Sequence, residues 1–303
     1  MRPDARDTLE KLLGDRVRFD VPLARLTSLR VGGAVEAVAT PTDRGEVLAL
    51  LQICNGLALP QRVLGSGFNV LAPDAGLPGI VIRLTRFRGL QRDPGGLRAE
   101  AGVSHSQMTR QCCEQGLSGL EFAAGIPGNV GGWLAMNAGI PEREMKDVVR
   151  EVEVAAPDGR CVRNVQAGEL DFGYRALRGL EPGSVLLSAL FEVVTATAEA
   201  VRTAVDHLLA ARARSQPLDV PSCGSVFKNP AGDHAGRMIE AAGMKGYRIG
   251  GAQISPIHAN FIANTGGATS ADVLALIREA RQRVLEQTGT RLETEVHILG
   301  GSP

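Results

Sequence analysis

Two glycine-rich stretches constrain the fold of this chain more than any other feature. Glycine accounts for 37 of 303 residues, about 12% where ~7% is usual, and much of it is clustered. One cluster, Gly65–Asn69, follows an expected strand at residues 61–64, and the other spans residues 125–139. Because glycine has no Cβ, such loops can turn tightly and direct several backbone N–H groups at one phosphate. Both loops are therefore candidates for anion binding.

Neither loop matches a standard nucleotide-binding motif. The Gly-x-Gly-x-x-Gly pattern of Rossmann folds fails at Val70, and the chain contains no Gly-x-x-x-x-Gly-Lys-Ser/Thr P-loop. A plain tight turn remains the alternative for the first loop, and a buried crossing of chain segments for the second. Two such loops in one domain favour a dinucleotide, and the open turn Asn137-Ala138-Gly139 adds further backbone amides.

Charge and hydropathy exclude several classes of partner. The 33 Lys and Arg residues balance 33 Asp and Glu, whereas proteins that bind nucleic acid or anionic lipid need an excess of basic residues. No apolar run reaches the ~18–20 residues that span a bilayer. The five cysteines form no Cys-x-x-Cys pair and no zinc-ligand spacing with histidine. We therefore expect a cytoplasmic protein with small-molecule partners and without nucleic acid, membrane or metal.

The pattern of apolar residues predicts a mixed fold whose first part is rich in strands. Helices are expected at residues 7–13, from residue 43, and at 104–116, 199–214, 235–242 and 271–288. Strands are expected at residues 35–39, 61–64, 80–84, 89–91, 97–101, 148–155, 160–165, 184–194, 261–264 and 292–299. Because the strand-rich chain becomes helical near residue 196, we predict two domains, residues 1–196 and 197–303.

The segment Gly224–Pro230 carries a hydroxyl, an ammonium and a carboxamide at one strand-to-turn junction, from Ser225, Lys228 and Asn229. Taken alone, it is also compatible with a serine in a strand ladder and a solvated lysine. The Gly-x-Ser-x-Gly elbow is absent, which argues against a Ser-His-Asp hydrolase. The neighbouring Cys223 is a candidate reactive thiol, although the sequence identifies no base for it.

Three other segments carry polar side chains that are candidates for function. Arg175 lies in an aromatic, otherwise apolar context and can pair with a carboxylate through two hydrogen bonds, with an ordinary surface cation as the alternative. Glu293 and Glu295 share one face of the last expected strand. If both are buried, one of them should stay protonated; if they are exposed, they simply belong to the solvent-facing side of the strand. The remaining candidates, which precede the strand expected at residues 261–264, are Gln253, His258 and Asn260.

Taken together, these segments resemble the UDP-N-acetylenolpyruvoylglucosamine reductase family over nearly the whole chain. In order, the matching segments are Thr27–Gly33, Gly65–Asn69, Gly125–Gly132, Gly173–Arg175, Gly224–Pro230, Gly250–Gln253 with His258–Asn264, and Leu292–Gly300. The Gly-Ser-x-Phe-Lys-Asn-Pro segment is the most specific of them. The length and spacing are similar to the family's shorter type, which lacks an inserted Tyr-bearing loop.

The resemblance implies both a fold and a reaction. The fold is α+β, with an FAD-binding domain of the vanillyl-alcohol-oxidase (PCMH) type, whose core covers about residues 25–195, and a smaller α+β substrate-binding domain. In the implied reaction, NADPH reduces non-covalently bound FAD, and UDP-N-acetylglucosamine enolpyruvate is then reduced to UDP-N-acetylmuramate. This enzyme activity supplies peptidoglycan synthesis, and through it cell-wall biogenesis, cell shape and cell division.

The resemblance also assigns roles to residues by position. It implies that Arg175 and Glu295 stabilise negative charge beside the substrate carboxylate and that Ser225 protonates the substrate carbon. FAD contacts are expected at Gly65, Ser66, Gly67, Phe68, Asn69, Val70, Gly125, Ile126, Pro127, Gly128, Asn129, Gly131, Gly132, Asn137 and Ala138. Substrate contacts are expected at Tyr174, Lys228, Asn229, Gln253, His258 and Asn260.

Two loop residues depart from the family pattern, and two alternative functions remain. Phe68 stands where Ser is usual and Asn129 where Ser or Cys is common, so side-chain hydrogen bonds to the pyrophosphate are expected to differ. One alternative is another flavin oxidoreductase of the same fold, such as a sugar or hydroxy-acid oxidase. It should lack the set of Ser225, Arg175 and Glu295, which is intact here. The other alternative is a non-catalytic binding protein, which would stay colourless with FAD.

Overall fold

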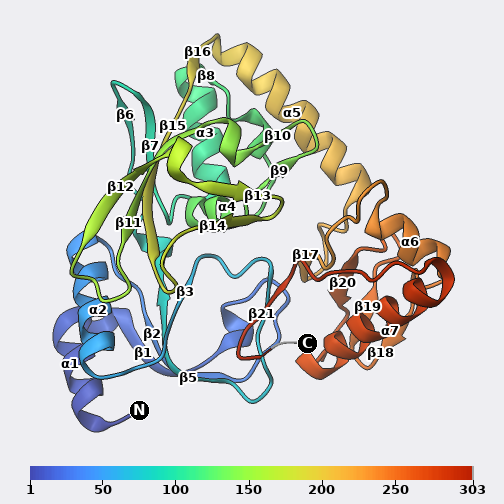
Figure 1. Ribbon diagram of the computed structural model, residues 1–303, viewed down its shortest axis with the longest axis horizontal. Coiled ribbons are helices and arrows are strands. Elements are labelled where there is room, and N and C mark those ends of the chain that lie inside the picture. The colour runs from blue at the N-terminus through green and yellow to red at the C-terminus, as the bar shows by residue number, and fades with distance from the viewer. Residues whose placement is uncertain (302–303) are drawn as a thin grey trace. The chain divides into compact units, whose positions relative to one another are not determined.

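The computed structural model describes residues 1–301 of the chain (Figure 1). Its helices are α1 (Pro3–Leu13), α2 (Arg44–Gly56), α3 (His105–Gln115), α4 (Val130–Ala135), α5 (Ala198–Ser215), α6 (Ala235–Ala241) and α7 (Ser270–Thr288). Within the described residues, none of these helices combines the length and the apolar surface that a bilayer crossing needs.

The strands are mostly short. They are β1 (Val17–Pro22), β2 (Ala34–Ala39), β3 (Gln61–Leu64), β4 (Val70–Leu71), β5 (Leu77–Arg83), β6 (Leu90–Asp93), β7 (Gly96–Glu100), β8 (Leu117–Ser118), β9 (Gly139–Ile140), β10 (Arg143–Glu144), β11 (Val149–Ala155), β12 (Val162–Gln166), β13 (Asp171–Gly173), β14 (Ala176–Arg178), β15 (Val185–Phe191), β16 (Val194–Thr195), β17 (Ser222–Ser225), β18 (Arg248–Ile249), β19 (Ala252–Ile254), β20 (Phe261–Asn264) and β21 (His297–Ile298).

The chain forms two compact units, each of which is discontinuous in sequence. The first unit comprises Met1–Phe19, Ala37–Ser66 and Gly79–Arg212. The second unit comprises Asp20–Glu36, Gly67–Pro78 and the chain from Ala213 onward. The loop Gly65–Asn69 therefore gives its first two residues to the first unit and the rest to the second unit.

Five antiparallel strands form the larger sheet of the first unit, in the order β12-β11-β15-β7-β6. One face of this sheet packs with α3 and α4 in a core that includes Val152, Ala189 and Trp133. Two hairpins lie within this sheet, because β6 pairs with β7 and β11 with β12, at strands that the sequence predicts. Alternation of apolar and polar residues along each strand is what puts these side chains on one face.

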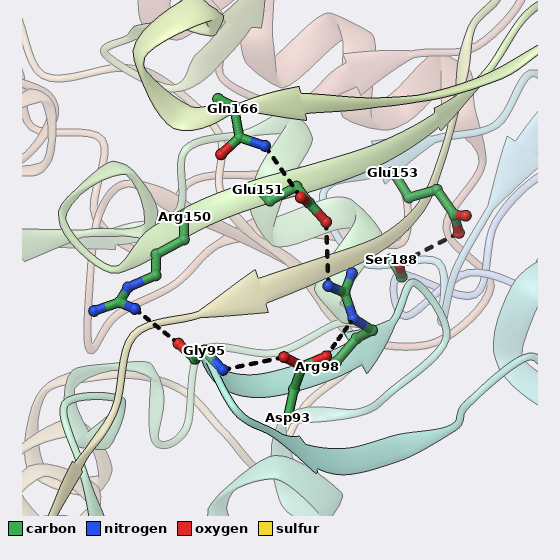
Figure 2. Close-up of polar contacts among 8 residues, drawn as sticks. All are labelled: Asp93, Gly95, Arg98, Arg150, Glu151, Glu153, Gln166 and Ser188. Atoms are coloured by element: carbon green, nitrogen blue, oxygen red, sulfur yellow. Dashed lines mark hydrogen bonds and ion pairs between the residues drawn. The ribbon is translucent and has the colours of Figure 1, made fainter.

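The opposite face of the same sheet carries a polar network (Figure 2). The Arg98 guanidinium lies between Asp93 and Glu151, with N–O distances of 3.2 and 3.1 Å. Gln166 Nε2 donates to Glu151 at 3.1 Å. Because these side chains satisfy one another, this face is a polar surface of the sheet, and the apolar core lies on the other side.

A second, four-stranded sheet has the order β1-β2-β5-β3, with β3 and β5 running parallel. Helices α1 and α2 pack against it in a core that includes Leu9, Leu51 and Ile80. Helix α1 begins at Pro3, four residues before the start that the sequence predicts. Proline is tolerated in the first turn because the N–H that it lacks has no intrahelical partner there.

The second unit is built on an antiparallel sheet of order β17-β20-β19-β18, which packs with α6 and α7 (Figure 1). The start of α7 differs from the prediction by one residue, since Thr269 and not Ser270 is its cap. Asp272 N donates to Thr269 Oγ1 at 3.1 Å, and Thr269 N donates to the Asp272 carboxylate at 2.9 Å. This reciprocal pair needs an acidic residue at the third helical position, and only the observed start, one residue earlier than predicted, places Asp272 there.

The expected strand 292–299 is wrong in extent, because only His297–Ile298 forms a strand, parallel to β4. The preceding residues run beside the segment after β17 through an isolated bridge between Phe227 and Thr294. The expected alternation is visible at Leu292 and Val296, which are buried. A single bridge satisfies the backbone of this stretch without a continuous ladder, and apolar alternation cannot distinguish the two arrangements.

Candidate active site

The second glycine-rich loop leads into α4 and is braced by the segment 101–105. Val130 N donates to Val103 O and Gly131 N to Ala101 O, both at 2.9 Å. Both partners come from the chain that leads from β7 into α3. The loop is therefore held by backbone bonds on one side, within the first unit.

Two glycines of this loop, Gly128 and Gly132, are uncrowded. An ideal Cβ at Gly132 meets no atom within 4 Å, and at Gly128, whose φ is +117°, it meets only Trp133 Nε1, at 3.9 Å. That indole nitrogen is buried and has no hydrogen-bond partner within residues 1–301. An unpartnered buried donor costs free energy. Uncrowded backbone beside such a donor is what a phosphate-bearing cofactor such as FAD requires.

The first glycine-rich loop is fixed by hydrogen bonds at both ends. In the first unit, Ser66 N and Ser66 Oγ both donate to Asn129 Oδ1 at 2.6 Å. In the second unit, Asn69 N donates to Cys223 O and Asn69 Nδ2 to Glu295 O, both at 3.2 Å. Asn69 therefore links the loop to the two segments for which the sequence predicts catalytic roles.

Gly67→Ala is expected to destabilise the second unit strongly. Gly67 has a φ of +75°, and a Cβ there would lie 1.8 Å from Leu26 O, so conformation and space both oppose a side chain. The free energy of unfolding, measured by urea denaturation, should fall by roughly 2–4 kcal/mol. Gly246 is the matched control, because its φ is +80° and no atom lies within 4 Å of its Cβ position. Gly246→Ala should cost about 1 kcal/mol. Equal losses would contradict the steric explanation.

Ser225 is the last residue of β17, and the backbone around it is hydrogen-bonded to two neighbouring segments. Ser225 pairs with Phe261 of β20. The next residue, Val226, donates its N–H to Asn260 O and accepts from Glu295 N, both at 2.8 Å. The segments that carry Ser225 and Glu295 are therefore neighbours within the second unit, although they lie 70 positions apart in sequence.

The two carboxylates of the last segment have different surroundings. Glu293 has a side chain that is 77% exposed and lies 3.6 Å from Lys228 Nζ, whereas Glu295 is half-buried. Of the two alternatives for this pair, exposure to solvent is the one observed for Glu293. Lys228 also donates its backbone N–H to Glu293 O at 2.9 Å.

Two of the candidate substrate residues use their carboxamides to hold the backbone of this segment. Asn260 is 4% exposed; its Oδ1 accepts from Phe227 N at 2.9 Å and its Nδ2 donates to Phe227 O at 2.8 Å. Asn229 Oδ1 accepts from Ala235 N at 3.0 Å, at the start of α6. These bonds shape the segment around Ser225, and substrate contact by either residue stays a prediction.

Gln253 and His258 are also engaged within the second unit. Gln253 Nε2 donates to Gly246 O at 2.9 Å. His258 Nδ1 accepts from Asn260 N at 3.2 Å, so its proton is on Nε2 when the ring is neutral. Burial lowers the pKa of His258 below its usual range, which favours that neutral form.

Arg175 is held in a defined position in the hairpin of β13 and β14. Its φ is +54°, a left-handed conformation that residues other than glycine rarely adopt. Its Nη1 lies 3.6 Å from Glu144 Oε1, and its Nη2 donates to Gly139 O at 3.4 Å. The guanidinium also lies over the Tyr174 ring, 5.0 Å from the centroid. A cation fixed in this way can stabilise charge without reorganising.

The side chain of Asn137, which precedes the β13–β14 hairpin in the chain, supports the same hairpin. It is fully buried, and its Nδ2 donates to Glu144 Oε2 at 2.9 Å and to Gly173 O at 3.0 Å. Its Oδ1 accepts from Lys146 N at 3.0 Å. The sequence predicts Asn137 as a cofactor contact, whereas its side chain is committed to the protein. Glu144, which orients both Asn137 and Arg175, was not identified from the sequence.

Arg212 of α5 is a second residue that sequence reasoning missed. Its Nη1 donates to Gly125 O at 3.2 Å, across 87 positions of sequence. Burial lowers the pKa of the Arg212 guanidinium, and the like charge of Arg175 lowers it further. Two guanidinium groups near the second glycine loop create a positive potential that favours an anionic ligand.

Iodoacetamide is expected to label native protein at Cys161 alone. Cys161 is exposed, whereas Cys54, Cys112, Cys113 and Cys223 are buried. Burial raises the pKa of Cys223 to about 12, so the reactive thiolate is scarce at neutral pH. Mass spectrometry should find one adduct on folded protein and five in urea. Alkylation of native Cys223 would revive the hypothesis of a reactive thiol.

Comparison with known proteins identifies the family. Residues 35–164 match the family model "FAD binding domain", and residues 216–299 match "UDP-N-acetylenolpyruvoylglucosamine reductase, C-terminal domain". A curated relative of the latter name from Anaeromyxobacter sp. (strain K) is 44% identical over 96% of this chain and 87% of its own length. Another, from Geotalea uraniireducens, is 40% identical over 99% of both chains.

Solved structures agree with the sequence comparisons. The crystal structure of UDP-N-acetylenolpyruvylglucosamine reductase from Thermus caldophilus matches with a TM-score of 0.80 and 37% identity, covering 93% of this chain and 99% of that one. An alkyldihydroxyacetonephosphate synthase matches with a TM-score of 0.50 at 18% identity over 64% of this chain and 41% of its own, which shows a shared fold alone. The fold that the sequence predicts, an FAD-binding domain with a smaller α+β domain, is confirmed. This chain belongs to the UDP-N-acetylenolpyruvoylglucosamine reductase family.

Proposed function

We propose that this chain is a flavin-dependent UDP-N-acetylmuramate dehydrogenase. It uses NADPH and FAD to reduce the enolpyruvyl ether of UDP-N-acetylglucosamine to a lactyl ether. The observation that carries the proposal is 44% identity over 96% of the chain to a protein named for this substrate, with Ser225, Arg175 and Glu295 all present. The product is a peptidoglycan precursor, so the protein acts in the cytoplasm on small molecules, without nucleic acid or membrane partners.

The functional domains follow the order of the two family models. Residues 1–196, with a core of about 25–195, bind FAD, and residues 197–303 bind the substrate. The model for FAD binding matches within the first range and the C-terminal model within the second, which supports this division. The two glycine loops supply the FAD contacts, through backbone N–H groups more than side chains.

The reduction is a hydride addition followed by a protonation. FAD held by the two glycine loops would, once reduced by NADPH, supply the hydride for the substrate double bond. Negative charge then develops beside the substrate carboxylate, and the fixed Arg175 guanidinium stabilises it. Glu295 can support that charge in its protonated form or by orienting Arg175, because a bare carboxylate would repel it.

Ser225 completes the reaction as the proton donor to the substrate carbon. A serine hydroxyl is a weak acid in water, so this transfer requires a strongly basic acceptor such as a carbanion. The backbone bonds of Val226 hold Ser225 in place on β17. Lys228 and Asn229, three and four residues later, contact the polar part of the substrate.

A visible absorption spectrum tests the proposal. Purified protein, with FAD added if necessary, should be yellow, bleach with NADPH and regain its colour with the enolpyruvyl sugar nucleotide. Protein that bleaches but is not reoxidised by this substrate would indicate another flavin oxidoreductase. Protein that stays colourless with FAD would indicate a binding protein and overturn the proposal.

A further inference from the structure

The Asn129 side chain connects the two glycine loops within the first unit. Its Oδ1 accepts two hydrogen bonds from Ser66, from the backbone N–H and from Oγ, each at 2.6 Å. Its Nδ2 donates to Gly102 O at 2.7 Å. Because Asn129 is 3% exposed, water does not compete for these bonds.

The backbone around Asn129 is anchored, and the first loop packs closely against the Asn129 side chain. Asn129 pairs with Ser104 in an isolated bridge, so its own backbone is anchored. An ideal Cβ at Gly65 would lie 2.7 Å from Asn129 Oδ1. The first loop therefore needs glycine at residue 65 partly because the Asn129 carboxamide approaches so closely.

We infer that Asn129 is a positioning residue that holds both loops in their binding arrangement before the dinucleotide arrives. This inference rests on the proposed FAD function. We call the hydrogen bonds from the Asn129 side chain to Ser66 and Gly102 the clamp. A loop that is already ordered loses little conformational entropy on binding, so the clamp raises the affinity for FAD without contacting the cofactor. Serine or cysteine, common at this position in the family, has a shorter side chain with one polar atom, in place of the separate oxygen and NH2 group with which Asn129 bonds Ser66 and Gly102. The clamp is thus a property of this chain's own sequence.

The test compares Asn129→Ala with wild type in the full-length protein. Removing the three hydrogen bonds of this buried side chain should raise the Kd for FAD about ten- to hundredfold, measured by quenching of flavin fluorescence on binding. In the protein without FAD, amide hydrogen exchange of the peptide that contains Ser66 should become faster, because its N–H loses its acceptor. Gln52→Ala is the matched control. It removes one side-chain bond to Gly159 O of 3.0 Å in the same unit and should leave both measurements unchanged.

Asn129→Asp provides a readout that loss of stability alone would not produce. At neutral pH its carboxylate still accepts from Ser66 but faces Gly102 O without a proton. Protonation restores the donor, so FAD binding by this variant should tighten as the pH falls, whereas binding by Asn129→Ala should not. If the Kd of Asn129→Asp for FAD showed the same pH dependence as the Kd of Asn129→Ala, that result would count against the clamp.

The outcomes separate this inference from the proposed function. Wild-type protein that binds no FAD would overturn the proposed function and the cofactor role of the clamp together. Wild-type protein that binds FAD, with Asn129→Ala binding equally well and exchanging equally slowly at Ser66, would overturn the inference alone. Weaker binding in Asn129→Ala and in Gln52→Ala alike would also overturn it, because general loosening of the unit would then explain the loss.

Discussion

Ser225→Ala is expected to leave reduction by NADPH intact and to slow reoxidation by the enolpyruvyl substrate by about 10²–10⁴-fold, the usual contribution of a general acid. The change removes one hydroxyl at the end of β17. The bonds of Val226 to Asn260 and Glu295 come from the backbone and remain. The variant should therefore fold and bind FAD as wild type does, with the defect confined to the half-reaction that consumes a proton. Stopped-flow absorbance of the flavin measures both half-reactions.

Ser222→Ala is the control for this experiment. Ser222 lies on the same strand, is also half-buried and uses its carbonyl to accept from Ser28 Oγ at 2.7 Å. Its hydroxyl has no role in the proposed reaction, so both half-reactions should keep their wild-type rates. Ser225→Cys restores a proton donor and should recover part of the reoxidation rate. Unchanged reoxidation in Ser225→Ala would remove Ser225 from the mechanism.

The elements that the sequence could predict are those with strong local signals. Helix α3 begins after Ser104, whose Oγ accepts from Gln107 N at 3.2 Å, and ends at Gly116 in a left-handed conformation. The expected boundaries of this helix are confirmed because both caps are local. Strand β3 lies at residues 61–64, the range predicted for the strand before the first glycine loop.

Long-range organisation could not be predicted in the same way. The second unit takes Asp20–Glu36 and Gly67–Pro78 from the first quarter of the chain, and no composition shift marks those points. Such segments join a unit through tertiary bonds, for example from Asn264 Nδ2 to Leu29 O at 3.0 Å. A single boundary near residue 196 reflects only where the local pattern changes from strand to helix.

The same contrast applies to the candidate site. Motifs that lie in one short segment, such as the glycine loops and the segment around Ser225, were found because their residues are adjacent. Arg212 was missed because its partner Gly125 lies 87 positions earlier in the chain. Glu144 was missed because its partner Arg175 lies 31 positions later. The interpretation of Asn129 as a departure that changes hydrogen bonds to the pyrophosphate also missed its partner, since Ser66 lies 63 positions earlier.

Arg175→Gln is expected to lower the rate of flavin reoxidation by substrate about 10²–10³-fold, because it removes a fixed cation from developing negative charge. The fold should survive. Glu144, which loses its arginine partner, keeps Lys146 Nζ at 3.1 Å and Asn137 Nδ2 at 2.9 Å. The carboxylate is therefore not left as an unpaired, partly buried charge, and thermal unfolding should shift little. The measurements are stopped-flow reoxidation and thermal denaturation of the same samples.

Arg175→Lys separates charge from geometry. Lysine keeps the positive charge, but its single ammonium cannot reproduce the planar fork that reaches both Glu144 and Gly139, so its reoxidation rate should fall between wild type and Arg175→Gln. Arg178→Gln is the control, since Arg178 is an exposed arginine in the same hairpin and should show wild-type kinetics. If Arg175→Gln and Arg178→Gln behave alike, Arg175 is an ordinary surface cation. If Arg175→Lys is as slow as Arg175→Gln, orientation by Glu144 and Gly139 matters as much as the charge itself.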